Sequence, residues 1–144
     1  MDLALAEAAR ALARGEVPVG CVIVDSVAET VIAAAGNRVE ELGDPTAHAE
    51  MLAIREAARR LGTRHLGTCD LYVTLEPCTM CAAAISFARV RRVCFGAYDA
   101  KMGGVDHGAR VFARETCHHR PEVLGGIGER AAATLMRQFF ATKR

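Results

Sequence analysis

Short β-rich runs alternate with helical patterns along this chain of 144 residues, and this alternation constrains the fold more than any other feature. The β-rich runs 17–24 and 30–35 flank a polar segment and predict an antiparallel hairpin. Further strands are expected at 71–75 and 90–97. Strands that alternate with helices after a hairpin favour a mixed sheet covered on both faces. We therefore expect an α/β fold with α/β/α layers around a mixed sheet of about five strands.

Helical patterns are expected over four segments: 3–14, 47–61, 78–88 and 129–142. The first two end before a glycine, which is a common helix stop. Pro77 is expected in the first turn of the third helix, where proline is tolerated. The glycine-rich residues 102–108 and the segment that follows, to Pro121, are expected to be loop with short pieces of structure.

The composition fits one compact domain over residues 1–144, because 51% of the residues are hydrophobic and 24% are charged. No stretch approaches the roughly 20 apolar residues that span a bilayer. The first residues form an alanine-rich amphipathic pattern and do not resemble a signal peptide. We expect a cytoplasmic protein without a membrane partner.

Cysteines offer the first chemical indication, because the chain has six of them. A cytosolic compartment keeps thiols reduced, so two close cysteines there more often bind a metal or react than form a disulfide. Only Cys78 and Cys81 are close in sequence. Cys21 and Cys94 lie within apolar runs and are expected to be buried and inert.

Cys78 and Cys81 are expected on the first turn of a helix, where backbone N–H groups and the helix dipole favour thiolates. Zinc is the natural metal for such a pair, because it accepts sulfur and nitrogen donors in tetrahedral geometry. A fourth position left open for water would make the site catalytic. By itself the Cys-x-x-Cys spacing also fits redox chemistry or chance packing.

His48 and Glu50 supply an imidazole and a carboxylate at the start of the preceding helix. Side chains at i and i+2 of a regular helix point apart, so both can address one metal only if it lies beyond the N-terminal end of that helix. Pro77 places the two cysteines at a strand-to-helix junction. Two helix N-termini that face each other would therefore form one pocket.

His-x-Glu followed by Pro-Cys-x-x-Cys is the motif of zinc-dependent nucleobase deaminases. Beyond this motif, nearly the whole chain resembles the bacterial tRNA adenosine deaminases of the cytidine/deoxycytidylate deaminase superfamily. The runs that carry the resemblance are EVPVG (16–20), GNR (36–38), DPTAHAE (44–50), LYVTLEPCTMCAAAIS (71–86), FGAYDAK (95–101) and the closing LMRQFFATKR. Tyr98 departs from the family, in which basic residues often occupy its place, and the loop 26–29 is slightly long.

The resemblance implies a cytidine-deaminase-like fold and hydrolytic deamination of the wobble adenosine of tRNA to inosine. It implies one Zn²⁺ per subunit, with His48, Cys78 and Cys81 as ligands. Glu50 would take a proton from the zinc-activated water and pass it to the base. Two thiolates and a neutral imidazole cancel the charge of Zn²⁺, so a local base is needed.

Substrate contacts are implied by the resemblance alone. Asn37 would contact the flipped base, Val19 and Leu75 would line the pocket, and the backbone around Ala49 and Glu76 would help to hold the base. The segment from Asp99 to Lys101 and the basic C-terminal helix, with Arg137, Lys143 and Arg144, would approach the anticodon loop. A homodimer is implied, and an arginine tRNA (tRNA-Arg) is the first candidate partner.

Charge supports a nucleic-acid partner modestly. Residues 1–88 hold 7 basic and 12 acidic side chains, whereas residues 89–144 hold 11 basic and 5 acidic ones. Basic side chains gain affinity for nucleic acid by displacing counterions from phosphates. The same asymmetry also arises from solvated faces.

Two other functions remain open. The chain could deaminate a free base or nucleoside, such as guanine or cytosine, with the same zinc chemistry. It could also be an RNA-binding module with a structural zinc, which would need a fourth protein ligand such as Cys69, Cys117 or His118. His118 and His119 beside Cys117 could form a second metal cluster, although adjacent histidines on a polar loop are usually solvated or contact RNA.

Overall fold

A computed structural model describes residues 1–144, and its core element is a five-stranded sheet in the order β2-β1-β3-β4-β5. β1 (Gly20–Asp25) pairs antiparallel with both β2 (Thr30–Gly36) and β3 (Cys69–Leu75). β4 (Arg92–Ala97) and β5 (Glu122–Leu124) then follow parallel to β3. The prediction of a mixed sheet with an N-terminal hairpin is confirmed.

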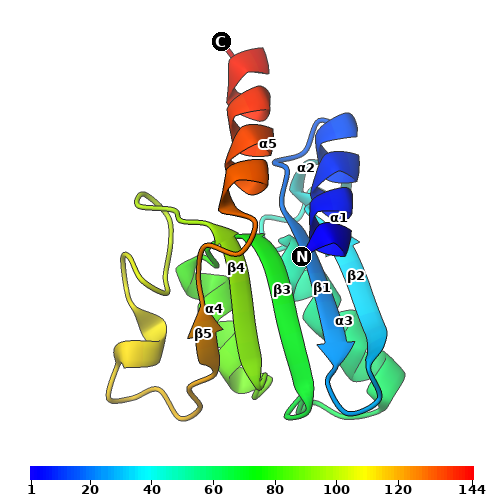
Figure 1. The fold of residues 1–144 in the computed structure, drawn as a ribbon, viewed down its shortest axis with the longest axis vertical. Coiled ribbons are helices and arrows are strands. Elements are labelled where there is room, and N and C mark those ends of the chain that lie inside the picture. The colour runs from blue at the N-terminus through cyan, green and yellow to red at the C-terminus, as the bar shows by residue number, and fades with distance from the viewer.

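Helices cover both faces of the sheet (Figure 1). α1 (Asp2–Ala13) and α5 (Glu129–Thr142) lie on one face, and α3 (Ala49–Leu61) and α4 (Thr79–Phe87) lie on the other. The predicted α/β/α layering is therefore confirmed. Two short elements complete the chain: α2 (Val39–Leu42) and the 3₁₀-helix η1 (Val111–Ala113).

The structure departs from the predicted elements at several places, including the start of β4 at Arg92 and the short helix α2, and three departures have a clear local cause. β1 begins at Gly20 and not at residue 17, because Pro18 lacks an N–H and the N–H of Val19 bonds to the carbonyl of Val17 in a tight turn. Pro77 lies before α4 and not in its first turn, since Cys78 keeps the extended backbone of an N-cap residue. β5 was not placed by the sequence, because three residues are too short for a periodic pattern.

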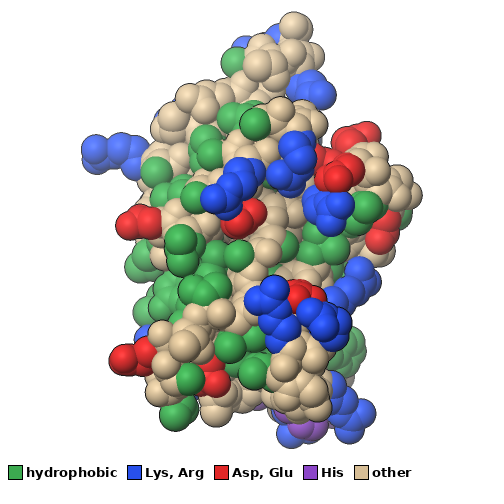
Figure 2. Space-filling model, turned by 90° about the vertical axis from the view of Figure 1, so that its right-hand side faces the viewer, with side chains coloured by type: hydrophobic (Ala, Val, Ile, Leu, Met, Phe, Trp, Pro, Cys, Tyr) green, Lys and Arg blue, Asp and Glu red, His purple; other side chains and the backbone are tan.

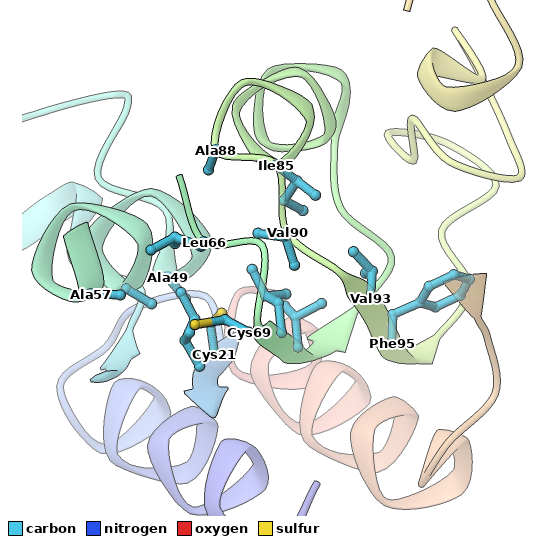
Figure 3. Packing of buried hydrophobic residues seen from close by; sticks show 14 of the residues in the cluster. Cys21, Ala49, Ala57, Leu66, Cys69, Ile85, Ala88, Val90, Val93 and Phe95 are labelled. Carbon is cyan, nitrogen blue, oxygen red and sulfur yellow. The ribbon is translucent and has the colours of Figure 1, made fainter. Parts of the chain in front are cut away.

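The main core lies between the sheet and the pair α3 and α4 (Figure 3). Ala49, Ala53 and Ala57 are fully buried on α3, and such small side chains let this helix approach the sheet closely. Cys21 is fully buried in the same cluster, and burial raises the pKa of its thiol well above the ordinary value. Cys94 is also buried, so the expectation of buried cysteines at both positions is confirmed.

Basic and acidic side chains lie next to each other on the face beside β2 and α3 (Figure 2). Ion pairs join Arg59 and Arg60 to Glu56, and Arg38 to Glu41. Exposed pairs of this kind contribute about 0–1 kcal/mol each, so they chiefly keep this face solvated. Nowhere does the chain form a helix with the length and hydrophobicity that a bilayer crossing needs.

Candidate active site

Two helix N-termini meet beyond the carboxyl end of β3. His48 is the N-cap residue of α3 and Cys78 is the N-cap residue of α4, and both have extended backbone geometry. His48 precedes the first helical turn, so its ring does not have to point away from the Glu50 side chain as it would inside a regular helix. The ring faces Cys78, while Glu50 belongs to α3. The predicted facing of the two helix N-termini is confirmed.

His48, Cys78 and Cys81 bring their donor atoms within 4.8 Å of one another. The Nδ1 atom of His48 lies 3.6 Å from Sγ of Cys78 and 3.5 Å from Sγ of Cys81. A tetrahedral zinc ion with ordinary Zn–S and Zn–N bonds holds a sulfur and a nitrogen ligand about 3.5–3.6 Å apart. The side chains therefore fit zinc, and no fourth protein ligand joins the group.

The electrostatics of the site favour a thiolate at Cys78. Hydrogen bonds from Cys81 and then His48 lower the pKa of Cys78 to about 4. The pKa of Cys81 is raised because it shares a proton with Cys78 and is buried. The N-terminal ends of α3 and α4 add partial positive charge, which stabilises a thiolate at this position.

Glu50 is a buried carboxylate beside this group, with only 4% of its surface exposed. Burial is the main reason that the pKa of Glu50 rises to about 7. A carboxyl group with a pKa near the working pH can both accept and return a proton. Because Glu50 does not belong to the ligand group, its geometry fits proton transfer and not metal binding.

A cavity of about 490 Å³ opens onto His48 and Glu50. This size falls within the range of small-molecule sites, roughly 300–1,000 Å³. The other lining residues come from both ends of the chain and from the loops between them: Gly15, Glu16, Val17, Val19, Asn37, Val39, Glu40, Leu75, Asp99, Met102, Phe139, Phe140 and Lys143.

Four of the predicted substrate-binding residues, Val19, Asn37, Leu75 and Asp99, line this cavity. The other three do not. Ala49 is fully buried in the core as the first residue of α3, and Lys101 is exposed on the loop after β4. The Glu76 side chain is buried and hydrogen-bonded to backbone N–H groups of residues 99–107.

Sequence reasoning assigned no role to several lining residues. Phe139 and Phe140 reach the cavity from α5, and Met102 reaches it from the loop after β4. The adjacent phenylalanines could have indicated a second contact surface on α5, because the helix buries only Phe139 of the two. No sequence spacing indicates Met102.

Glu16 is a further residue that the sequence analysis missed. Its carboxylate is buried, accepts a hydrogen bond of 3.1 Å from Nδ2 of Asn37 and accepts another of 2.8 Å from the N–H of Glu41. An amide oxygen would be repelled by this carboxylate, so Glu16 determines which way the Asn37 amide faces. The cavity-lining asparagine is thus oriented by a neighbour 21 residues away.

The alternative metal ligands lie elsewhere. Cys69 begins β3, at the opposite end of the strand from Cys78. Sγ of Cys117 lies 3.4 Å from the hydroxyl oxygen of Ser86, and Nε2 of His119 lies 2.7 Å from the carbonyl oxygen of Val90. Cys117 and His119 therefore hold neighbouring parts of the chain together and do not belong to the zinc-fitting group. The structure shows neither a fourth zinc ligand nor a second metal cluster among the proposed residues.

Comparison with known proteins identifies the family. Residues 1–97 match the model of the cytidine and deoxycytidylate deaminase zinc-binding region. The tRNA-specific adenosine deaminase of Agrobacterium fabrum is 56% identical over 144 residues, which is 100% of this chain and 93% of the relative.

Solved structures agree with this result. One, from work on A-to-I editing by tRNA:A34 deaminases at the wobble position of transfer RNA, is 55% identical with a TM-score of 0.91, covering 94% of this chain and 96% of the other. The guanine deaminase of Nitrosomonas europaea is 26% identical, with a TM-score of 0.77. The match covers 97% of this chain and 80% of the guanine deaminase. The chain therefore belongs to the tRNA-specific adenosine deaminases, a family with the zinc-binding region of the cytidine and deoxycytidylate deaminases.

Proposed function

We propose that this chain converts the wobble adenosine of a tRNA to inosine by hydrolytic deamination, with residues 1–144 as a single deaminase domain. The observation that carries the proposal is that the buried Glu50 and His48, a member of the zinc-fitting His/Cys/Cys group, line one cavity. Relatives that are 56% and 45% identical are named tRNA-specific adenosine deaminases, which supports tRNA as the substrate.

The reaction adds water at C6 of adenine and releases the amino group as ammonia. His48, Cys78 and Cys81 would hold zinc, which would supply the activation of the attacking water. Glu50 takes the proton from that water, delivers it to N1 of the ring and later helps to protonate the departing amine. Collapse of the tetrahedral carbon then leaves inosine.

The cavity walls would hold the flipped base. Val19 and Leu75 supply apolar surface, and Asn37 supplies an oriented amide. A single-stranded anticodon loop suits this site, since its bases can be turned out of the stack at low cost. The family resemblance also assigns the backbones of Ala49 and Glu76 to holding the base, although neither residue lines the cavity.

The RNA backbone would follow the rim of the cavity. Asp99 and Lys143 line the opening, and Nζ of Lys143 lies 5.2 Å from the centre of the Phe139 ring. Lys101, Arg137 and Arg144 are exposed around these positions and would contact phosphates. We propose tRNA-Arg as the natural partner and the cytoplasm as the location, where the free thiols of the site stay reduced.

The decisive experiment measures inosine in an anticodon stem-loop of tRNA-Arg after incubation with the purified zinc-loaded protein. Stem-loops of other tRNAs that carry adenosine at the wobble position test the choice of tRNA. Free guanine, cytosine and adenosine test the alternative function, which the structural likeness to a guanine deaminase makes relevant. Turnover of a free base without turnover of any stem-loop would overturn the proposal.

A homodimer is the proposed assembly. The outer side of α3 and α4 and the segment 109–119 enclose a groove of about 820 Å³, and Phe87 in its lining is 79% exposed. A second copy of the chain would cover this apolar surface. We expect the protein to sediment as a dimer and Phe87→Glu to sediment as a monomer. A monomeric parent protein at micromolar concentration would exclude the assembly.

Orientation of Asn37 by Glu16 leads to a prediction. Glu16→Gln replaces one of two acceptor oxygens with an NH₂ group, so either the Asn37 amide turns over or the N–H of Glu41 loses its partner. We expect kcat/KM for the stem-loop to fall about tenfold, as for a lost hydrogen bond to a charged group. The exposed Glu115→Gln is the matched control. An unchanged kcat/KM in Glu16→Gln would show that the amide orientation is irrelevant.

A further inference from the structure

We propose that Glu76 is a positioning residue that fixes residues 99–107 as a wall of the active-site cavity and thereby sets the affinity for the RNA. This inference rests on the proposed function. It concerns a buried carboxylate that neither lines the cavity nor belongs to the zinc-fitting group. The residue lies directly before the Pro77-Cys78 turn, at the end of β3.

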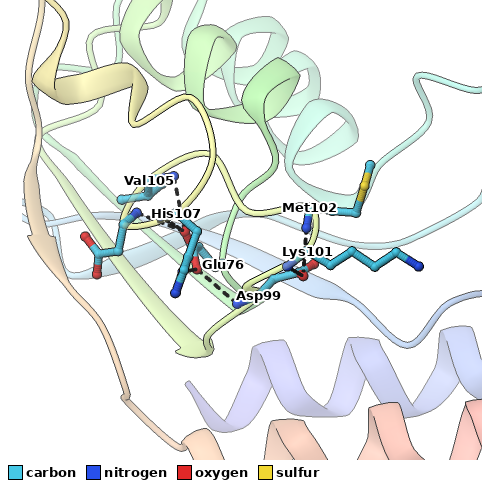
Figure 4. Close-up of polar contacts among 7 residues, drawn as sticks. Glu76, Asp99, Lys101, Met102, Val105 and His107 are labelled. Atoms are coloured by element: carbon cyan, nitrogen blue, oxygen red, sulfur yellow. Dashed lines mark hydrogen bonds and ion pairs between the residues drawn. The ribbon is translucent and has the colours of Figure 1, made fainter.

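Five N–H groups of one segment converge on this carboxylate (Figure 4). Oε1 accepts the backbone N–H groups of Val105, Asp106 and His107 at 3.2, 2.9 and 3.0 Å. Oε2 accepts the backbone N–H of Asp99 at 2.9 Å and faces Nδ1 of His107 at 2.8 Å. The side chain has no exposed surface, so these contacts replace solvent completely.

The ionised state of Glu76 is essential to this arrangement. Burial favours the neutral acid, but the hydrogen bonds from Asp99 and His107 outweigh burial and hold the pKa of Glu76 below its usual value. An ionised carboxylate accepts hydrogen bonds at both oxygens, whereas an amide accepts at one only. In Glu76→Gln the NH₂ group would face three backbone N–H donors in the place of Oε1, or the backbone N–H of Asp99 in the place of Oε2, so at least one donor loses its acceptor.

The segment held by Glu76 carries residues into the cavity. Asp99 and Met102 line it, and Oδ1 of Asp99 accepts the N–H groups of Lys101 at 3.0 Å and Met102 at 2.9 Å. Figure 4 shows Lys101 and Met102 on the turn that begins at Asp99. The N–H of Asp99 is itself held by Glu76, so the first residue of this turn depends directly on the carboxylate.

The same segment lies directly on the zinc-binding turn. The N–H of Gly104 donates to the carbonyl oxygen of Pro77 at 2.8 Å, and Gly103 pairs with Cys78 in an isolated β-bridge. A Cβ atom on Gly103 would lie 2.5 Å from the Glu76 carboxyl group, and one on Gly104 would lie 2.5 Å from the backbone nitrogen of Thr79. Because residues 103 and 104 pack this closely, a displacement of residues 99–107 would change the shape of the cavity wall that Asp99 and Met102 form.

Tyr98 keeps the imidazole of His107 in place. Its ring packs edge-on against Phe95, with centroids 5.0 Å apart, and edge-on against His107, with centroids 6.2 Å apart. An aromatic residue at position 98 therefore has a structural purpose here, although basic residues often occupy this place in the family. The imidazole Nδ1–H supplies the only side-chain donor to Glu76.

Loss of this arrangement should affect substrate binding more than chemistry. The zinc-fitting residues and Glu50 begin α3 and α4, whose positions depend on the sheet and the core. Asp99 and Met102 instead depend on Glu76 for their place in the wall. A wall that contacts bound substrate throughout the reaction changes KM, with little effect on kcat.

The test compares Glu76→Gln, His107→Ala and His107→Asn in the zinc-loaded protein, with Glu115→Gln as the control. The Nδ2 atom of an asparagine can occupy the place of the imidazole Nδ1 and donate to Glu76. We expect Glu76→Gln to raise KM for the anticodon stem-loop about tenfold or more, with kcat within about threefold of the parent value. His107→Ala should raise KM severalfold, His107→Asn should restore it, and zinc content should stay at one ion per chain.

Hydrogen exchange gives a second measurement that is independent of activity. The backbone amides of Asp99 and of residues 105–107 should exchange faster in Glu76→Gln and His107→Ala than in His107→Asn. Unchanged exchange and unchanged KM would overturn the proposal, and so would a fall in kcat at constant KM. If Glu76→Gln does not fold, the two His107 variants decide the question. Failure of the parent protein to form inosine would refute the proposed function, while the exchange data would still test the role of Glu76.

Discussion

Replacement of Glu50 with alanine is expected to leave one zinc ion per chain and to lower kcat for the anticodon stem-loop by about 10²–10⁴-fold, the usual contribution of general acid–base catalysis. Glu50 is not part of the metal-fitting group, so zinc affinity should not depend on it. Its buried carboxyl group has a pKa of about 7 and can therefore receive and return the proton that deamination requires. Metal analysis and inosine quantification on the same sample test both parts.

Glu50→Gln is the matched control for this variant, because it keeps the volume of the buried side chain and removes only the proton transfer. Both variants should lose activity to a similar degree, because neither keeps a carboxyl group that can move the proton. Substantial deamination by Glu50→Gln would show that another group moves the proton. Loss of zinc from both variants would instead make Glu50 part of the metal site.

The sequence was sufficient for elements with strong local patterns. Residues 129–142 form α5 as expected, since its apolar residues repeat at helical spacing. α3 ends at Leu61 because Gly62 adopts a left-handed backbone with φ of +64°. β5 was missed for the opposite reason: its three residues are stabilised by pairing with β4, a contact between distant parts of the chain.

The metal site was also predictable, because His-x-Glu with Pro-Cys-x-x-Cys is a known motif, although His48 lies 30 residues from Cys78. His48 and Cys78 are N-cap residues, and this position frees each side chain from its helix and directs it past the helix end. The supporting polar contacts were not predictable. Glu16 reaches Asn37 across 21 residues and Glu76 reaches His107 across 31, and no periodicity relates residues so far apart.

Cavity walls show the same limit. Val19 and Asn37 were expected at the cavity from family resemblance, whereas Phe139 and Phe140 were not, although all four line it. The C-terminal helix carries its aromatic residues over the opening only because it packs against β4 and α1. The place of α5 beside α1 and above β4 (Figure 1) is therefore a property of tertiary packing, which the sequence pattern of α5 alone does not contain.

Removal of one zinc ligand should abolish activity without unfolding the chain. In Cys81→Ala the three-donor group loses a thiolate, and we expect zinc affinity to fall by more than about 100-fold, the upper range seen for residues that only support a ligand. His48→Ala should weaken zinc binding in the same way. The core of 19 buried residues contains no metal ligand, so both variants should keep the circular dichroism spectrum of the parent protein.

Cys117→Ser is the matched control for the cysteine variant, because its thiol contacts Ser86 and lies outside the metal-fitting group. Zinc affinity measured by competition with a chelator should be the same in Cys117→Ser as in the parent protein. It should be much lower in Cys81→Ala. Chelation of the parent protein should stop inosine formation, and added zinc should restore it, because α3 and α4, which carry the ligands at their N-terminal ends, pack on the sheet through residues of the hydrophobic core. Full zinc affinity in Cys81→Ala, or activity that survives chelation, would contradict the assignment of the site.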